Sequence, residues 1–434
     1  MDKMADVLGR AGAWCGQNKY LSAIKNAFQN FMPLTIAGAI GVLWCNVLVN
    51  ESTGLGIFFK PIMALEFLNP AFQAVNFCTI SCITVGITLG IAQEIGVWNM
   101  GAEKAGYIPG LVGLAAWLSV TNTSHMVEGA KEAFTGIAGN ELGATGLFTG
   151  MIIGVLSVEL FCFFEKQDAL KIKMPEQVPP GVARAFEVLV PATITLIITA
   201  CIGSACYNLT GLYLNDVIKN GIQGPLGAVG ATIPGVMIIY LVIMLFWLVG
   251  IHGNNMLSAV KEALFTPLAL ENVEAFNKHQ TPKNIINMYA LQMWGEFGGS
   301  GVTIGLVIAI MIFGKREDNK AIASLSLVPG LFNINETVTF GIPMVLNPIL
   351  GIPFVFACLV TILVGYVLTV IGFCPVACLT VPWTTPPIVF GFLACGANVM
   401  GAVTQAILIV VSTVIYTPFL ISYEKYQNKQ AAEA

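Results

Sequence analysis

Apolar residues occur along this chain in long runs, and short polar links separate the runs. A helix needs about twenty apolar residues to cross the hydrocarbon core of a membrane. The runs predict spans near residues 28–49, 72–93, 107–121, 143–164, 186–207, 229–251, 297–313, 349–372 and 397–420. The pattern therefore predicts an all-α integral membrane protein with about ten transmembrane helices.

The pattern changes after residue 252, where prolines and polar residues interrupt the apolar runs. Residues 252–287 carry charges, the segment 328–348 is broken by prolines and glycines, and residues 374–396 are rich in proline. Irregular backbone at membrane depth survives only where it is buried in protein or lines a cavity. These segments therefore predict re-entrant hairpins in addition to the spans.

The two parts of the chain differ in character. Residues 1–225 form conventional spans with glycine stripes such as Gly146, Gly150 and Gly154, which let helix backbones approach closely. We expect this part to be a scaffold or dimerisation region, although the stripes fit packing within one subunit as well as across a dimer. Residues 226–434 hold nearly all the broken polar segments and are expected to bind the solute.

Composition supports the membrane assignment. Of the 434 residues, 56% are hydrophobic and only 10% are charged, where a soluble domain carries about 25% charged residues. The mean hydropathy is +0.79. The start, Met1 to Lys25, lacks the apolar core of a signal peptide and is expected to be an amphipathic cytoplasmic segment on the membrane surface.

The basic residues predict the orientation. With the N-terminus inside, the layout of spans puts all basic residues on the cytoplasmic side except Lys60, Lys131 and Lys219. Both termini are then cytoplasmic. The links 252–284 and 314–320 also fall on the same side, so the helix near 297–313 needs a re-entrant partner in 284–296. Otherwise one of these links is outside.

Several classes of function receive no support from the sequence. The eleven cysteines lie mostly inside apolar runs without a CxxC pair, which indicates reduced thiols rather than a metal site. No GxxxxGK[ST] motif is present, so the chain is not expected to use ATP on its own. No basic run with aromatic residues suggests nucleic acid, and we expect no cofactor.

The segment VPGLFNINETVTFGIPMVLNP, residues 328–348, carries the strongest functional signal. It places Asn333, Asn335, Glu336 and Thr337 between apolar runs. A carboxylate at membrane depth is costly unless it faces protein or water, so it marks a functional site. We interpret the segment as a re-entrant polar element that handles a hydroxyl-rich solute. The alternative is a loop outside the bilayer.

A second polar turn follows an apolar span. His252 is succeeded by Gly253, Asn254 and Asn255. The histidine could cap the C-terminal carbonyls of the preceding helix. The functional interpretation is an open turn whose amides donate to and accept from sugar hydroxyls.

Two tryptophans extend the candidate site. Trp294 and Glu296 lie in a glycine-rich turn, where an aromatic face can pack on a pyranose while a carboxylate accepts from its hydroxyls. The alternative is an interfacial tryptophan anchor with a solvated glutamate. Trp383, in VPWTTPP, either faces the cavity or ends a helix.

Together these segments resemble a known family. They are IHGNNMLSAV (251–260), ALQMWGEFGGSG (290–301), LVPGLFNINETVTFGIPMVLNP (327–348) and LTVPWTTPPIVFGFLACG (379–396). The chain resembles, over nearly its whole length, the membrane permease component, enzyme IIC, of the bacterial phosphotransferase system. The resemblance is to the lactose/cellobiose/N,N′-diacetylchitobiose family.

The resemblance implies a transport function in the bacterial cytoplasmic membrane. Members take up a disaccharide and phosphorylate its C6 hydroxyl, with the phosphoryl group supplied by a phosphocysteine on a IIB protein. The resembling permeases are homodimers with two re-entrant hairpins. The family's histidine matches His252 and its glutamate matches Glu336. Because the sequence ends at Ala434 without a second domain, we expect IIB on another chain, which favours the cellobiose/chitobiose type.

The expected chemistry relies on positioning. Phosphoryl transfer to a hydroxyl needs an oriented nucleophile, and a buried carboxylate can act as general base. Glu336 fits this role, and His252 could bond the same hydroxyl or meet the phosphoryl charge; which of them acts as base stays open. The alternative function is an ion-coupled secondary sugar transporter with Glu336 and Glu296 as proton sites. A passive channel is a third hypothesis.

The orientation yields a labelling prediction. In a background without native cysteines, single cysteines at positions 168, 278 and 318 should react with a membrane-impermeant reagent only from the cytoplasmic face. Position 216 should react only from outside. A cysteine at 335 should react slowly and be protected by sugar. Rapid labelling at 335 that sugar does not slow would show an ordinary exposed loop.

Overall fold

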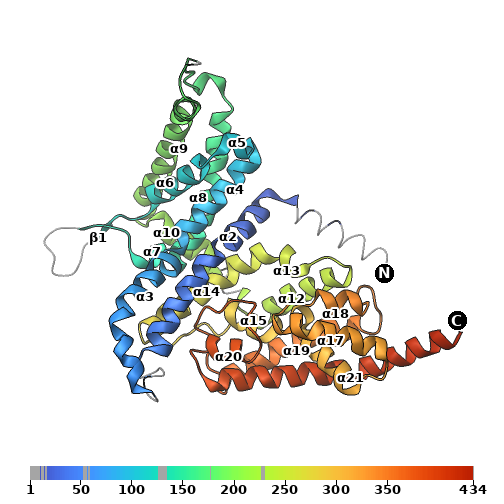
Figure 1. Cartoon of the computed structure of the whole chain (residues 1–434). Coiled ribbons are helices and arrows are strands. Elements are labelled where there is room, and N and C mark those ends of the chain that lie inside the picture. Colours follow the sequence, from blue (N-terminus) through green and yellow to red (C-terminus); the bar gives the residue numbers. More distant parts are fainter. Residues whose placement is uncertain are drawn as a thin grey trace. The chain divides into compact units, whose positions relative to one another are not determined.

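The computed structural model describes residues 10, 14, 17–51, 56, 59–125, 134–175, 177–225 and 230–433. Helices make up most of these residues, and the one strand pair among them joins β1 (Ser124–His125) antiparallel to β2 (Phe134–Thr135) (Figure 1). The predicted all-α class is confirmed. Most of the predicted amphipathic N-terminal segment lies outside the described residues.

The chain forms two compact units. The N-terminal unit comprises Gln17–Gly38 and Ala74–Ala228, whereas Ala39–Gln73 joins Val229–Ala434 in the C-terminal unit. The division predicted between residues 225 and 226 stays a prediction, and it differs from the compact units in the placement of residues 39–73. The roles expected for the two parts stay predictions.

The helical elements up to residue 223 range from single turns to helices of more than twenty residues. They are α2 (Lys19–Leu43), η1 (Trp44–Leu48), η3 (Lys60–Leu68), α3 (Asn69–Asn76), η4 (Phe77–Ser81), α4 (Ile83–Met100), α5 (Ala102–Ala105), α6 (Ile108–Val120), α7 (Gly139–Leu142), α8 (Ala144–Glu165), η5 (Asp168–Leu170), α9 (Pro180–Thr210), α10 (Leu214–Ile218) and η6 (Lys219–Gln223).

The elements after residue 229 include many short helices, as the broken pattern predicted. They are α12 (Ile233–Leu248), α13 (Gly253–Met256), α14 (Ser258–Asn277), α15 (Met288–Gly295), η7 (Ser300–Val302), α16 (Ile304–Phe313), α17 (Glu317–Leu331), α18 (Glu336–Gly341), α19 (Gly351–Val370), α20 (Val389–Ala394) and α21 (Val399–Glu433).

Several helices are long and apolar enough to cross a membrane. Among the described residues they are Lys19–Leu48, α8, α9, α19 and Val399–Gln430. Two broken pairs raise the number to as many as seven, and α6 and α12 are shorter apolar helices. The predicted count of about ten spans stays a prediction.

One broken pair lies where a re-entrant partner was expected. Residues Met288–Val302 and Ile304–Phe313 meet at an angle of 59°. Near the end of the first segment Gly298, Gly299 and Gly301 have φ values of 67°, 87° and 76°, a backbone region that strongly favours glycine. The glycine-rich turn therefore produces the break.

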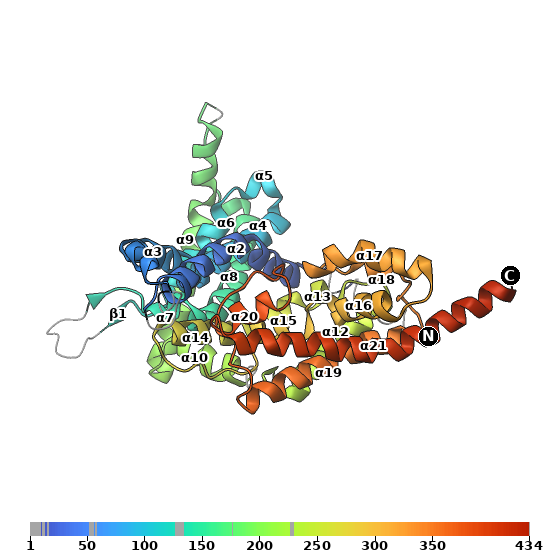
Figure 2. The same ribbon diagram turned by 60° about the horizontal axis from the view of Figure 1, so that its bottom comes forward.

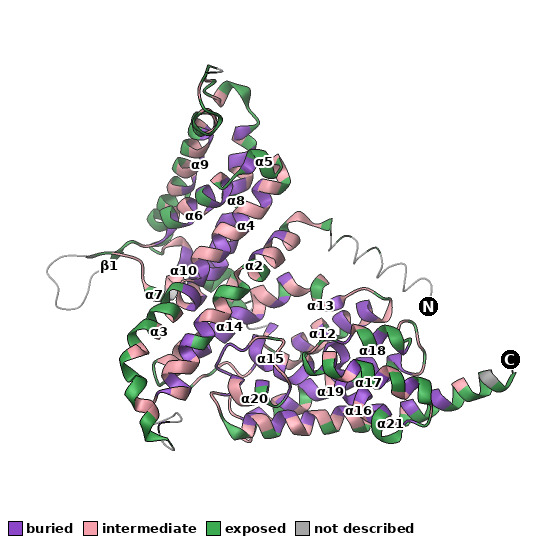
Figure 3. Cartoon of the chain, in the orientation of Figure 1, coloured by how far each residue is buried: buried purple, intermediate pink, exposed green. Residues whose placement is uncertain are grey.

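Glycine stripes pack helices of the N-terminal unit within one subunit. A Cβ on Gly150 of α8 would lie 2.2 Å from Thr88 Oγ1 on α4, and one on Gly113 of α6 would lie 2.3 Å from Ala92 Cβ. Buried positions run along α4 and α8 (Figure 3). The sequence left open whether the glycine stripes pack within one subunit or across a dimer. The glycines named here contact neighbouring helices of the same chain.

A different packing holds the C-terminal unit. The helices α19 and α16 both lie against the long α21, which Figure 2 shows in red beside α19. The Tyr416 hydroxyl on α21 donates to the Gly301 carbonyl at 2.7 Å. Gln405 accepts from the backbone N–H groups of Ile388 and Gly391 and donates to the Met293 carbonyl. These side chains satisfy backbone groups that the broken helices leave without helical partners.

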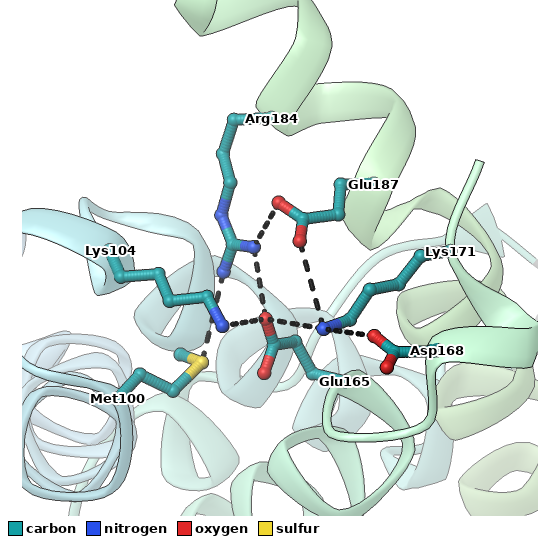
Figure 4. Close-up of polar contacts among 7 residues, drawn as sticks. All are labelled: Met100, Lys104, Glu165, Asp168, Lys171, Arg184 and Glu187. Carbon is teal, nitrogen blue, oxygen red and sulfur yellow. Dashed lines mark hydrogen bonds and ion pairs between the residues drawn. The ribbon is translucent and has the colours of Figure 1, made fainter. Parts of the chain in front are cut away.

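A network of ion pairs surrounds Glu165 at the C-terminal end of α8 in the N-terminal unit (Figure 4). The Glu165 side chain, 1% exposed at the end of α8, accepts from Lys104 at 2.9 Å and Arg184 at 3.0 Å, with Lys171 at 4.0 Å. Arg184 also pairs with Glu187 at 2.7 Å. One carboxylate therefore ties α5, the α8–α9 connection and the start of α9 together.

We expect Glu165→Gln to lower the free energy of unfolding by about 3 kcal/mol. This is the lower end of the range for breaking a buried ion pair, since the partly exposed Lys104 can be hydrated. Thermal unfolding in detergent would measure the loss. Glu317→Gln removes an exposed i,i+3 pair with Lys320 and is the matched control. Equal melting temperatures for both variants would contradict a stabilising role of the network.

Candidate functional site

The residue His252 begins a short helix next to the end of α12. Gly250 has φ +81°, which reverses the chain after α12. The His252 Nδ1 atom then accepts from the Asn255 N–H at 3.2 Å and caps the N-terminus of α13. Its ring lies 4.4 Å from the Trp247 ring. The alternative of a C-terminal cap is therefore wrong, because the ring caps the following helix.

The structure brings His252 and Glu336 together from segments far apart in the sequence. Glu336 is the first residue of α18, and its Oε1 atom lies 3.8 Å from His252 Nε2. The Glu336 side chain is 46% exposed and the His252 side chain is 37% exposed. The pair is thus close without a hydrogen bond between its members, and both side chains remain accessible.

The protonation of His252 follows from its contacts. Burial lowers the pKa of the imidazole, although the negative charge of Glu336 opposes the shift. The ring is therefore mostly neutral at pH 7. Because Nδ1 accepts from the backbone, the remaining proton lies on Nε2. The site presents an N–H donor beside a carboxylate acceptor.

Two asparagines of the 328–348 segment stabilise the loop that carries Glu336. Asn333, at φ +63°, accepts from the Gly298 N–H at 2.6 Å and donates to the carbonyls of Trp383 and Thr385. Asn335, 3% exposed, donates to the Ser300 carbonyl at 3.0 Å. In this conformation these amides bind backbone groups and a neighbouring hydroxyl and so position the loop. Their predicted role in sugar binding stays a prediction.

The tryptophans differ in accessibility. Trp294 is 1% exposed, and its ring lies against Gly365 of α19, where a Cβ would come within 2.3 Å. In this conformation the ring is buried, and its predicted stacking on a sugar stays a prediction. Trp383 is 44% exposed and lies in the loop that Asn333 holds. Trp383 therefore remains available to a ligand, and Trp294 belongs to the core.

The remaining predicted residues lie near the pair. Thr337 follows Glu336 on α18 and is exposed, as is Asn255 on α13. Asn254 donates from Nδ2 to Ser300 Oγ at 2.9 Å. Glu296 accepts from the Tyr240 hydroxyl at 2.7 Å and pairs with Lys261, so it is not the solvated glutamate of the alternative.

Sequence reasoning missed Lys261 and Tyr240. Lys261 falls in the segment predicted to be a cytoplasmic link, yet it is buried on α14. Tyr240 falls in an apolar span and is also buried. A lysine inside the apolar stretch AVKEALF was the available signal, because a buried lysine requires a partner.

The site holds no evident metal ligands. Within the described ranges, no three His, Cys, Asp or Glu side chains gather in a group that could bind a metal ion. The ten cysteines in these ranges are free thiols.

Comparisons with known proteins identify the family. The family described as "Phosphotransferase system, EIIC" matches residues 25–358. The oligo-beta-mannoside-specific EIIC component of Bacillus subtilis (strain 168) is 33% identical over 429 residues, covering 98% of this chain and 94% of that protein. The cellobiose-specific EIIC component of Lactococcus lactis subsp. lactis (strain IL1403) is 28% identical, covering 98% of both.

A solved structure agrees with this assignment. The crystal structure of the transporter ChbC, the IIC component from the N,N′-diacetylchitobiose-specific phosphotransferase system, has a TM-score of 0.88 with this chain. It is 29% identical, and the match covers 97% of both chains. EIIC components are multi-pass membrane proteins that bind a sugar and act with a IIB partner. On these grounds the chain belongs to the EIIC family of sugar permeases of the phosphotransferase system.

Proposed function

We propose that this permease binds a disaccharide of the cellobiose or diacetylchitobiose type and carries it inward across the cytoplasmic membrane. It presents the C6 hydroxyl of the sugar to a phosphorylated IIB protein. The single observation that carries the proposal is the 3.8 Å separation of His252 Nε2 and Glu336 Oε1 in two accessible side chains.

A sugar hydroxyl fits between these two groups. An oxygen atom can lie about 2.8 Å from both His252 Nε2 and Glu336 Oε1, which is hydrogen-bond distance. The hydroxyl would donate to the carboxylate and accept from the Nε2–H group. This arrangement orients the oxygen lone pairs and supplies a base for the departing proton. Glu336 is the proposed base, and His252 stabilises the neighbouring charge.

The names of the relatives support the class of sugar. Similar proteins are specific for oligo-beta-mannosides and for cellobiose, and the similar solved structure comes from an N,N′-diacetylchitobiose system. Trp383 offers an accessible aromatic face for a pyranose ring. Asn254, Asn255 and Thr337 supply further polar groups around the pair.

The proposal extends to the oligomeric state and the orientation in the membrane. We propose a homodimer with both termini in the cytoplasm, where a IIB protein approaches the bound sugar. The outward apolar side chains of α9, among them Leu189, Ile197 and Ile202, offer a surface for a second copy. The asymmetric distribution of basic residues supports the orientation.

The ion-coupled alternative is not favoured. The relatives are components of the phosphotransferase system. Glu296, one of its two expected proton sites, is paired with Lys261 and accepts from Tyr240. The Glu296 carboxylate is therefore already engaged by partners within the protein.

Replacing the proposed base should separate binding from phosphorylation. In vesicles supplied with phosphorylated IIB and labelled cellobiose or diacetylchitobiose, Glu336→Gln should lower the rate of sugar phosphate formation by about 10²-fold or more, as expected for loss of a general base. Some sugar binding should remain, because glutamine keeps the size of the side chain. Glu274→Gln, at an exposed ion pair on α14, is the control.

The same vesicles test the function as a whole. The wild-type protein should accumulate sugar phosphate only with phosphorylated IIB, and ionophores should not change the amount. Accumulation of free sugar that collapses with ionophores would overturn the proposal. A Glu336→Gln variant that phosphorylates at the wild-type rate would refute the base assignment alone.

The two tryptophans should respond differently to alanine. Trp383→Ala should weaken disaccharide binding by about 1–3 kcal/mol, as for loss of an aromatic contact. Trp294→Ala should instead destabilise the fold by about 3–5 kcal/mol, the usual cost of removing a core tryptophan. Calorimetric titration and thermal unfolding measure the two effects. Unchanged affinity in Trp383→Ala would show that this ring does not contact the sugar.

A further inference from the structure

A buried ion pair lies beside the candidate site. Lys261 of α14 is 6% exposed, and its Nζ atom pairs with Glu296 Oε1 and lies 5.5 Å from the centre of the Tyr240 ring. The Tyr240 hydroxyl donates to the same carboxylate oxygen at 2.7 Å. Removing one member would leave an uncompensated buried charge, which is strongly destabilising.

The pair does more than neutralise charge, because Lys261 has a third polar partner. Its ammonium donates to Asn254 Oδ1 at 3.3 Å, while Asn254 Nδ2 donates to Ser300 Oγ at 2.9 Å. Turning the amide over would bring its NH₂ group against the ammonium. The orientation of Asn254 is therefore fixed by Lys261, and its second N–H remains available for another acceptor.

The oriented amide lies next to the pair proposed to hold the reacting hydroxyl. Asn254 is two residues beyond His252, at the start of the same short helix. On the other side, the Ser300 carbonyl accepts from Asn335, which directly precedes Glu336. The contacts thus connect Lys261 through Asn254 and Ser300 to both segments of the site.

We propose that Lys261 is a positioning residue that sets the sugar affinity by orienting the Asn254 amide toward a sugar hydroxyl. The inference rests on the proposed function. A lysine that only held α12, α14 and the turn after α15 together would alter stability. A lysine that orients Asn254 alters the affinity for sugar in protein that is fully folded.

The decisive variant carries no charge at either position. Lys261→Met/Glu296→Gln removes both members of the pair, so it should melt within a few degrees of the wild type. Without the Lys261 ammonium, the Asn254 amide group can adopt either orientation. The Kd of the double variant for cellobiose and N,N′-diacetylchitobiose should therefore rise at least tenfold. In the phosphorylation assay with phosphorylated IIB, the KM for sugar should rise by the same factor as the Kd. The kcat at saturating sugar should stay within threefold of the wild-type value.

A third substitution shows whether Asn254 transmits the effect. Asn254→Ala should weaken binding about as much as the double variant, and combining all three changes should cause no additional loss, because residues in one network are not additive. Lys278→Met removes an exposed lysine directly after the end of α14 and should change neither the Kd nor the melting temperature.

The outcomes distinguish the hypotheses. Unchanged affinity in the folded double variant would overturn the inference and leave the pair a purely structural device. Additive losses with Asn254→Ala, or a fall in kcat at constant KM, would also overturn it. A wild-type protein that binds neither disaccharide would overturn the proposed function, and the inference with it.

Discussion

The requirement that every buried charge and polar backbone group find a partner within the protein governs this structure. In an apolar unit, water is not available to solvate a carboxylate, an ammonium or a free N–H group. Glu165 is buried among Lys104, Arg184 and Lys171, and Glu296 is paired with Lys261. These pairs lie where helices end or break, so satisfying the charge also fixes the local geometry.

The broken helices of the C-terminal unit follow from the same requirement. A helix interrupted by proline and glycine leaves backbone groups without partners, and asparagine and glutamine side chains replace them. Asn333 joins the loop before α18 to the turn after α15 and to the proline-rich loop around Trp383. Gln405 performs a similar role at the start of α20. Polar residues that resemble ligand contacts in the sequence thus serve as supports for the site.

These supports leave a small set of accessible groups. His252, Glu336, Trp383, Asn255 and Thr337 reach the surface of the C-terminal unit, whereas Asn335 and Trp294 are buried behind them. A neutral imidazole donor beside a carboxylate acceptor suits a hydroxyl group. The arrangement is suited to positioning a substrate, as the proposed transfer of a phosphoryl group from a partner protein requires.

The sequence by itself determined the helical membrane class and the family, and its motifs selected His252 and Glu336 as candidate site residues. These depend on local hydropathy and on ordered motifs, which are readable along the chain. Only the tertiary structure decided which polar side chains are accessible to a ligand and which are bound within the protein. Burial of Trp294 depends on Gly365, and the Lys261–Glu296 pair joins residues on different helices. A side chain's partners depend on contacts between distant segments, and no local pattern records them.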